Sequence, residues 1–422
     1  MTGKTIAEKI LSRAAGKSVR AGEIAVCTPD LAMGTDGSIP MALDYLEAIR
    51  PGAVPCAPQR MVFALDHYGA ASGARAQALQ QRARVFALAH GIATIEAGIG
   101  IGHQCILESG KARPGQLMVG ADSHSTSYGA ANAFATGIGS SDLAGIMLCG
   151  QVWLKVPQSM RVSLVGQLSP GVSAKDVALT LARLHGANGA NYLAMEFQGP
   201  GIAALDMDDR IVLANMAVEL GAKAGIFPFD DTTARWLAQL PGADYEPVQA
   251  DPDAHYSSSM TLVLDTVRPQ AALPHRVDNV VDIDSLAPTP IDMVYLGTCT
   301  GGRLKDYREA LDELQARGGV APGVRLVVTP ASESILREME NNGMLAAFIA
   351  LGAELQPPGC GSCCGTCGMV PADGQTVIST ANRNFKGRMG NAAASIVLAS
   401  PRSCGAAAAT GYFGMARQQA EA

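Results

Sequence analysis

Short apolar runs alternate with amphipathic stretches along most of the chain. The runs MRVSLV (160–165), MVYLG (293–297) and VRLVVTP (324–330) are strand-like and predict buried strands. Between such runs, the stretch DRIVLANMAVELGAKAG (209–225) spaces its apolar residues as a helix does. Strands that alternate with helices in this way predict an α/β fold with mostly parallel sheets.

The apolar pattern at the N-terminus predicts a helix of the mature protein. Ile6, Ile10 and Leu11 lie at helical spacing among charged residues, so the segment lacks the unbroken apolar core of a signal peptide. The longest apolar stretch begins at Met344, is too short to span a membrane and predicts a core helix. We therefore expect a cytoplasmic protein without a membrane partner, in which cysteine thiols stay reduced.

Two changes in the pattern suggest domain boundaries. The first lies near Pro157, where WLKVPQS gives way to a new strand, and the second lies in the polar, proline-containing span 269–290. We expect three α/β domains, which comprise residues 1–157, 158–276 and 277–422. The length of 422 residues is ample for several buried cores.

Composition narrows the class of protein. Hydrophobic residues make up 48% and charged residues 17%, with 47 glycines, which is typical of a compact enzyme and argues against disorder. The formal net charge is −6, so the chain has no excess of basic residues. We therefore expect no nucleic-acid partner.

Several histidines lie beside acidic residues or in turn-rich loops. Asp66 precedes His67, His103 follows a glycine-rich segment, and Asp122 and His124 belong to VGADSHSTSYG. A carboxylate fixes the tautomer of a histidine and tunes its pKa for proton transfer. Each of these histidines alone is more often structural, but VGADSH follows a predicted strand, and α/β sheets place active sites at the carboxyl ends of strands.

A polar pair interrupts the predicted helix around residue 215. Asn215 and Glu219 lie four residues apart, and therefore on one helical face, among apolar neighbours. A polar pair in such surroundings requires a partner, and either a histidine or a bound ligand would suit.

The ten cysteines include one unusual cluster. Cys360 and Cys363 form a Cys-x-x-Cys pair that continues into Cys364 and Cys367, while Cys299 lies alone in GTCTGGR. The cluster could be a four-thiolate zinc site, a redox dithiol, or two ligands of an iron–sulfur cluster with Cys299 as the third; spacing alone leaves zinc and iron–sulfur equally open. The surrounding glycines and prolines favour the last reading, since such a backbone lets amide groups approach the sulfurs. Three thiolates would leave one metal position open to a substrate.

A basic loop follows the cysteines. The segment STANRNFKGRMGN (379–391) brings together Asn382, Arg383, Lys386 and Arg388. Arginines are suited to bidentate contacts with the carboxylates of a small dicarboxylic acid, whereas solvated surface charge is the alternative.

These motifs, in this order, resemble those of the aconitase superfamily, and within it the large subunits of two-subunit members such as 3-isopropylmalate dehydratase. The resemblance is carried by Asp66-His67, GADSHSTSYGAANAFATGIGSSD, WLKVP, Asn-x-x-x-Glu, the lone cysteine, Cys-x-x-Cys, NRNFKGR and ASPRSCGAAAATGYF. It covers the chain nearly end to end.

The resemblance implies a set of site residues. It implies a 4Fe-4S cluster bound by Cys299, Cys360 and Cys363, with Cys364 and Cys367 dispensable. His67 would protonate the leaving hydroxyl group. The implied acid-base and orienting residues are Asp66, His67, His103, Asp122, His124 and Glu219, and the implied substrate-binding residues are Asn215, Asn382, Arg383 and Arg388.

One part of the family's machinery is absent from the sequence. The proton of the substrate carbon is taken by a serine in a swivelling domain with a GSSRE-like motif, but the nearest string here, GSSD from Gly139, lacks the arginine. We therefore expect a small partner subunit that carries this domain and its serine.

The resemblance predicts a hydro-lyase that acts on a branched 2-hydroxy dicarboxylate. Isomerisation of 3-isopropylmalate to 2-isopropylmalate in leucine biosynthesis is the leading expectation; maleate, citraconate, dimethylmalate and homoaconitate are alternative substrates. A non-catalytic or zinc-binding scaffold is a further alternative. The sequence departs from the family at Gly301, where relatives have asparagine, at Thr35, where they have histidine or glutamine, and at Ser125, where they have threonine.

Overall fold

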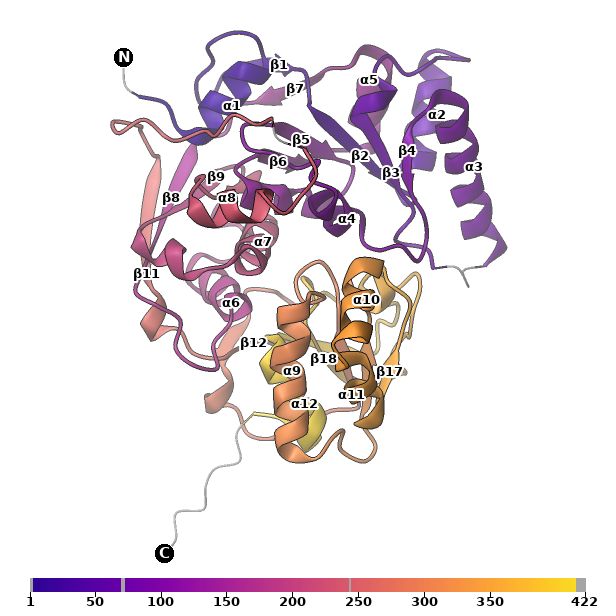
Figure 1. Ribbon diagram of the computed structural model, residues 1–422, viewed down its shortest axis with the longest axis vertical. Helices are drawn as coiled ribbons and strands as arrows, with labels where there is room; N and C mark the ends of the chain where they lie inside the picture. The colour runs from indigo at the N-terminus through magenta and orange to yellow at the C-terminus, as the bar shows by residue number, and fades with distance from the viewer. Residues whose placement is uncertain (1–2, 70–72, 243, 415–422) are drawn as a thin grey trace, which may run out of the picture. The chain divides into compact units, whose positions relative to one another are not determined.

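The computed structural model describes residues 3–69, 73–242 and 244–414, which form mostly parallel sheets with flanking helices (Figure 1). The elements group into two compact units. The first unit comprises Met1–Gln167 and Asn188–Val263, and the second comprises Leu168–Ala187 and Leu264–Ala422. The predicted α/β class is confirmed. The division into three domains stays a prediction.

A five-stranded parallel sheet organises the first half of the first unit (Figure 1). Its strands, in spatial order, are β4 (Ala93–Ile95), β3 (Met61–Ala64), β2 (Leu31–Thr35), β5 (Leu117–Gly120) and β6 (Phe134–Gly137). Helix α2 packs against α3 and α5. The helices of this half are α2 (Ile39–Ile49), α3 (Ala74–His90), α4 (Gly102–Glu108) and α5 (Ser140–Cys149).

A four-stranded parallel sheet organises the rest of the first unit. Its strands, in spatial order, are β10 (Ala224–Ile226), β9 (Ala194–Gln198), β8 (Ser159–Val165) and β11 (Ser258–Val263). The antiparallel pair β1 (Ile24–Cys27) and β7 (Val152–Lys155) lies outside both sheets. The helices here are α1 (Ile6–Ala14), α7 (Met207–Met216) and α8 (Asp231–Leu237).

Helix α1 is the predicted N-terminal helix, and a buried carboxylate fixes its start. Thr5 and Glu8 form a capping box, and Glu196 accepts hydrogen bonds from the backbone N–H groups of Ile6 and Ala7 at 3.3 and 3.0 Å. These acceptors satisfy N–H groups that have no partner within the helix. The apolar face of α1 joins a core that includes Ile10, Leu11, Ile39, Phe63, Phe134 and Leu143.

The second unit contains a seven-stranded sheet. Strand β12 pairs antiparallel with β13 and β19, and the remaining pairs are parallel. The strands, in spatial order, are β13 (Val280–Asp282), β12 (Gln270–Ala272), β19 (Ser395–Ala399), β18 (Thr376–Ser379), β15 (Met293–Leu296), β16 (Arg325–Val328) and β17 (Ala353–Leu355). The short strands β14 (Thr289–Pro290) and β20 (Tyr412–Phe413) form a separate antiparallel pair.

The helices of the second unit pack closely where small residues allow it. The helices are α6 (Ala174–His185), α9 (Leu304–Arg317), α10 (Glu333–Asn341), α11 (Met344–Ala350) and α12 (Pro401–Thr410). Helices α9 and α12 lie side by side (Figure 1). A Cβ atom at Gly405 would lie 2.7 Å from the Cα of Ala310, so only glycine permits this approach.

The three predicted strands are confirmed as β8, β15 and β16. The apolar stretch from Met344 is shorter as a helix than predicted. Helix α11 ends at Ala350, and Ala353–Leu355 form β17. Gly352 has a φ of +99°, a conformation that ends a helix and turns the chain into the next strand.

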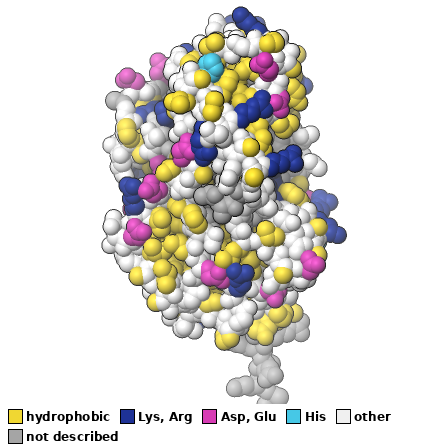
Figure 2. Space-filling view, turned by 90° about the vertical axis from the view of Figure 1, so that its right-hand side faces the viewer, with side chains coloured by type: hydrophobic (Ala, Val, Ile, Leu, Met, Phe, Trp, Pro, Cys, Tyr) yellow, Lys and Arg dark blue, Asp and Glu magenta, His cyan; other side chains and the backbone are white. Residues whose placement is uncertain are grey.

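No helix among the described residues is both long and apolar enough to cross a lipid bilayer. On the face drawn in Figure 2, basic and acidic side chains are interspersed, and hydrophobic side chains lie between them. The charges on that face therefore do not form a continuous basic strip.

Candidate active site

Three loops of the first unit meet at one edge of the five-stranded sheet. Strands β3, β2 and β5 are parallel neighbours, and they end at Ala64, Thr35 and Gly120. The carboxyl ends of parallel strands lie at the same edge, so the residues that follow them come together. These residues include Asp36 after β2, Asp66 and His67 after β3, and Asp122 and His124 after β5.

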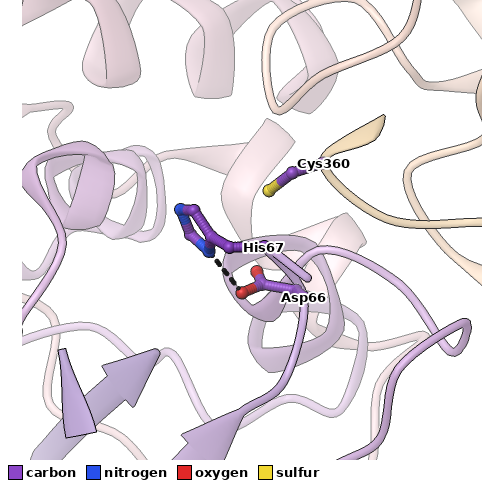
Figure 3. Close-up of side chains that lie close together, drawn as sticks. All are labelled: Asp66, His67 and Cys360. Carbon is purple, nitrogen blue, oxygen red and sulfur yellow. Dashed lines mark hydrogen bonds and ion pairs between the residues drawn. The ribbon is translucent and has the colours of Figure 1, made fainter. Parts of the chain in front are cut away.

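His67 lies between two carboxylates. Its Nδ1 is 2.8 Å from Oδ1 of Asp66, a contact drawn in Figure 3, and its Nε2 is 3.6 Å from Oδ2 of Asp122. Burial lowers the pKa of His67, but the two carboxylates outweigh burial and hold the pKa well above its ordinary value. The imidazole is therefore a cation at neutral pH.

The two carboxylates beside His67 stay ionised. Burial raises the pKa of Asp66, but the charge and hydrogen bond of His67 and the N–H of Gly102, at 2.7 Å, bring it below its usual value. Burial also raises the pKa of Asp122, but hydrogen bonds from His103 and His67 hold it well below its usual value. The side chains of Asp66, His67 and Asp122 thus place a positive charge between two negative charges.

Asp36 is a member of this cluster that the sequence prediction did not include. It is fully buried and accepts hydrogen bonds from the backbone N–H groups of His67 and Tyr68 at 3.1 and 3.0 Å. The Nε2 group of Gln80 donates to it at 2.9 Å. Burial raises the pKa of Asp36, and the charge of Asp66 adds to that effect. Its position directly after an apolar strand was the available signal.

His103 is fixed from both ring nitrogens. Its Nε2 lies 2.8 Å from Oδ1 of Asp122, and its Nδ1 lies 3.0 Å from the hydroxyl of Tyr128. A carboxylate can only accept, so Nε2 carries the proton, while the hydroxyl of Tyr128 contacts Nδ1 and also donates to Sδ of Met33 at 3.4 Å. Tyr128 was not predicted, because a buried tyrosine in a run of small residues gives no sequence signal for this contact.

The polar pair around residue 215 has the partners that its burial requires. Nε2 of His124 lies 3.1 Å from Oε1 of Glu219, so a histidine, one of the two partners considered, contacts Glu219. Asn215 instead donates to Oγ of Ser127 at 2.8 Å. The predicted helix is α-helical only as far as Met216. It continues as a 3-10 turn over Ala217–Leu220, which contains Glu219.

The predicted cluster ligands gather at the corresponding edge of the second unit's sheet. Cys299 follows β15, Asn382 follows β18, and Cys360 follows β17. These strands and β16 are parallel in the order β18-β15-β16-β17, so the three loops emerge at one edge. Cys299 and Cys363 are buried, and Cys360 is partly buried.

Polar groups of the second unit are directed at the cysteine sulfurs. Nδ2 of Asn382 lies 3.5 Å from Sγ of Cys299, and Nη2 of Arg388 lies 3.3 Å from Sγ of Cys363. Burial lowers the pKa of Arg388, but the nearby thiols outweigh burial and raise it above its usual value. Such donors stabilise the negative charge of sulfur ligands in iron–sulfur proteins. Arg383, on the same loop, is partly buried.

The thiols of the second unit do not converge as ligands of a single ion do. Four sulfurs around one zinc lie about 3.8 Å apart, given a Zn–S distance of about 2.3 Å. Among the described residues, no three cysteine sulfurs lie within 4.8 Å of one another. Cys364 instead contacts Oγ1 of Thr366 at 2.8 Å, and Cys367 contacts the carbonyl oxygen of Gly361 at 3.2 Å. The described cysteines are therefore not arranged as the ligands of a single zinc ion.

Two of the departures from the family have structural explanations. A Cβ atom at Gly301 would overlap the side chain of Thr380, so the threonine fills the space that a side chain at 301 would need. The hydroxyl of Thr35 lies 3.1 Å from Oγ of Ser38, which also accepts the N–H of Thr35 at 2.9 Å. Thr35 is therefore engaged in the turn that leads into α2.

Each unit thus brings together its own share of the predicted residues. The first unit gathers Asp66, His67, His103, Asp122, His124, Asn215 and Glu219, and the second gathers Cys299, Cys360, Cys363, Asn382, Arg383 and Arg388. The roles assigned to these residues stay predictions.

Comparison with known proteins agrees with the fold and the motifs. The Aconitase family (aconitate hydratase) matches residues 8–411. The chain is 42% identical over 414 residues to the 3-isopropylmalate dehydratase large subunit 1 of Thermotoga maritima, covering 97% of this chain and 98% of the relative. It is also 42% identical over 416 residues to the homoaconitase large subunit of Thermus thermophilus, covering 97% of each. Aconitase X of Thermococcus kodakaraensis has a similar fold, with a TM-score of 0.51 at 12% identity over 85% of this chain and 84% of that chain.

Proposed function

Because the chain belongs to the aconitase family, we propose that it is the large subunit of a two-subunit hydro-lyase that dehydrates and rehydrates a branched 2-hydroxy dicarboxylate. The observation that carries this proposal is the geometry of His67, whose two ring nitrogens face the carboxylates of Asp66 and Asp122 within a buried network of acids and histidines. Loss of a hydroxyl group as water needs such a proton donor.

The second unit offers a donor set that fits an iron–sulfur cluster. We assign a 4Fe-4S cluster to Cys299, Cys360 and Cys363, with the amide of Asn382 and the guanidinium of Arg388 directed at two of the sulfurs. When bound through three thiolates, such a cluster supplies an iron that can bind the hydroxyl and a carboxylate of the substrate and polarise the C–O bond.

His67 is the general acid in this proposal. Its charged imidazole donates a proton to the departing hydroxyl oxygen, and Asp66 at Nδ1 and Asp122 near Nε2 hold the ring and stabilise its charge. Asp36 fixes the loop by accepting the backbone N–H of His67. His103 in turn fixes the orientation of Asp122.

The remaining predicted residues orient the substrate. Asn215 is held by Ser127, and the pair of His124 and Glu219 forms a second buried acid–base contact. Arg383 is suited to a bidentate contact with a substrate carboxylate. Arg388 already contacts the sulfur of Cys363. Its positive charge would therefore stabilise that sulfur as well as bind the substrate.

The proton of the substrate carbon requires a base from elsewhere. We assign it to a serine of a small partner subunit, because GSSD from Gly139 lacks the arginine of the family's GSSRE-like motif. Two relatives with similar sequences are themselves named as large subunits. We place the complex in the cytoplasm.

The leading substrate is 3-isopropylmalate, the substrate in the name of the Thermotoga maritima relative, which would place the chain in leucine biosynthesis. Homoaconitate is a second candidate, favoured by the equally similar homoaconitase large subunit of Thermus thermophilus. Maleate, citraconate and dimethylmalate keep the same chemistry on other diacids.

The test is anaerobic co-purification of this chain with the small subunit whose gene lies nearest to the gene of this chain. We expect a brown complex with four irons and four sulfides per large subunit. When a panel of hydroxy diacids is tested, the true substrate should give the ultraviolet absorbance of an unsaturated diacid product. Activity should require both subunits and should decline in air. A colourless, zinc-containing and air-stable active protein would overturn the cluster assignment, and full turnover by the isolated chain would overturn the partner assignment.

A further inference from the structure

Lys175 is a fully buried lysine of the second unit, with 1% of its surface exposed. It is the second residue of α6 and so lies at the helix N-terminus, where the helix dipole disfavours a positive charge. Burial lowers the pKa of Lys175 to about 8, and nearby thiols act in the opposite direction. A positive charge at this place is therefore retained at a cost to stability.

Three of the hydrogen-bond acceptors of the Lys175 amine are uncharged oxygens. Nζ of Lys175 donates to Oγ1 of Thr300 at 2.9 Å and to the carbonyl oxygens of Thr380 and Ala381 at 2.9 and 2.8 Å. Three acceptors require three N–H groups, which only the protonated amine provides. The geometry therefore identifies the charged form.

The acceptors belong to the two loops that present Cys299 and Asn382. Thr300 directly follows Cys299, and Thr380 and Ala381 directly precede Asn382, whose amide contacts the sulfur of Cys299. Lys175 thus links the cysteine loop to the asparagine loop. The hydroxyl of Thr300 reinforces the link by donating to the carbonyl of Thr380 at 3.0 Å.

The buried positive charge of Lys175 would stabilise a buried negative charge nearby. Three thiolates around a 4Fe-4S core leave the cluster with a net negative charge, and that charge grows when the cluster is reduced. Fixed positive charge and hydrogen bonds near the sulfurs favour the more negative, reduced form. The ammonium of Lys175 could supply such a charge without contacting the substrate.

We propose that Lys175 is a positioning residue that locks the Cys299 and Asn382 loops together and balances the charge of the bound cluster. It thereby raises the reduction potential of the cluster and slows the loss of iron. This inference rests on the proposed function, since it requires a cluster at Cys299.

The test compares anaerobically reconstituted Lys175→Met, Lys175→Arg and wild type, each with the small subunit. Lys175→Met keeps an unbranched side chain, one atom shorter, and removes the charge, whereas Lys175→Arg keeps the charge. Lys111→Met, at an exposed lysine of the first unit, is the matched control. The readouts are iron and sulfide content, the rate of iron loss in air, and the midpoint potential of the air-oxidised cluster followed by electron paramagnetic resonance.

We expect Lys175→Met to lower the midpoint potential and to lose iron several-fold faster, Lys175→Arg to restore most of the potential, and Lys111→Met to match wild type. An unchanged potential and iron-loss rate in Lys175→Met would overturn the inference while leaving the proposed function intact. A wild-type chain that binds no cluster would instead overturn the proposed function.

A second variant separates positioning from charge and covers the case in which Lys175→Met fails to fold. Thr300→Val removes one acceptor of the lysine and retains the ammonium. We expect it to lose iron faster than wild type while its midpoint potential stays closer to wild type than that of a folded Lys175→Met. Iron loss at the wild-type rate in Thr300→Val would overturn the positioning role.

Discussion

Nδ1 of His67 lies 2.8 Å from a carboxylate oxygen of Asp66, and this pair sets the charge state of the acid–base cluster. Burial alone would favour a neutral imidazole, yet the carboxylates raise the pKa of His67 well above its ordinary value. The folded state therefore binds this proton more tightly than the unfolded state does. The resulting contribution to stability is fully present below the unfolded pKa of about 6.5 and is lost as the pH rises through the folded pKa.

Replacing Asp66 should move the alkaline limit of activity. Asp66→Asn removes the charge that raises the pKa of His67 most, so the histidine loses its proton at a lower pH. We expect the alkaline limb of kcat/KM for the reconstituted complex to shift toward neutral pH. Asp44→Asn, which alters an exposed carboxylate of the same unit, is the control and should leave the limb in place. A profile unchanged by Asp66→Asn would contradict the coupling.

Removing the proton donor should separate catalysis from cluster assembly. His67→Gln keeps a hydrogen-bonding side chain of similar length but cannot carry the acidic proton. We expect kcat to fall by about 10²–10⁴-fold, which is typical for loss of a general acid, with iron content unchanged. Iron analysis and steady-state kinetics on one preparation check both parts. A variant with near wild-type kcat would assign the proton to another group.

The sequence predicted most of the parts of this site but not all of their connections. The strands before Asp66 and Asp122 are short apolar runs, so their carboxyl-end position could be predicted. The contact of His103 with Asp122 depends on where α4 begins relative to a parallel sheet, and a sequence pattern does not contain that register.

Three residues escaped prediction for different physical reasons. Asp36 acts through backbone N–H groups, which leave no side-chain pattern in the sequence. Tyr128 lies in a run of small residues and contacts His103 only in the folded chain. Lys175 lies in the first turn of a helix and is indistinguishable in sequence from a solvated lysine, because only tertiary packing buries it.

The cysteines beyond the predicted ligands should be dispensable for iron. Cys364 and Cys367 contact Thr366 and the carbonyl of Gly361, respectively, and have no assigned place at the cluster. We expect the double variant Cys364→Ser/Cys367→Ser to retain wild-type iron and sulfide content after anaerobic reconstitution. Cys299→Ser is the matched comparison and should lose the brown chromophore. If the double variant loses metal while Cys299→Ser retains it, a four-thiolate site at 360–367 replaces the three-ligand assignment.

Gly301 and Thr380 should behave as one packing unit. A Cβ atom at residue 301 would overlap the Cβ and Oγ1 of Thr380, whose hydroxyl also bonds Gly297, so the threonine cannot simply rotate away. We expect Gly301→Ala to lower the free energy of unfolding of the chain without cluster by about 1–3 kcal/mol, the usual cost of overpacking a core. Thr380→Gly should also destabilise, since it removes those hydrogen bonds.

The double variant Gly301→Ala/Thr380→Gly provides the decisive comparison. Removing the threonine side chain clears the space that the new methyl group needs. The double variant should therefore lose less unfolding free energy than the sum of the two single losses, with a coupling of about 0.5–3 kcal/mol in a double-mutant cycle. Urea unfolding monitored by circular dichroism measures all four proteins, and Gly145→Ala, at a glycine with open space around it, controls for the general effect of replacing glycine. Strictly additive costs would instead show that backbone movement relieves the overlap between residue 301 and Thr380.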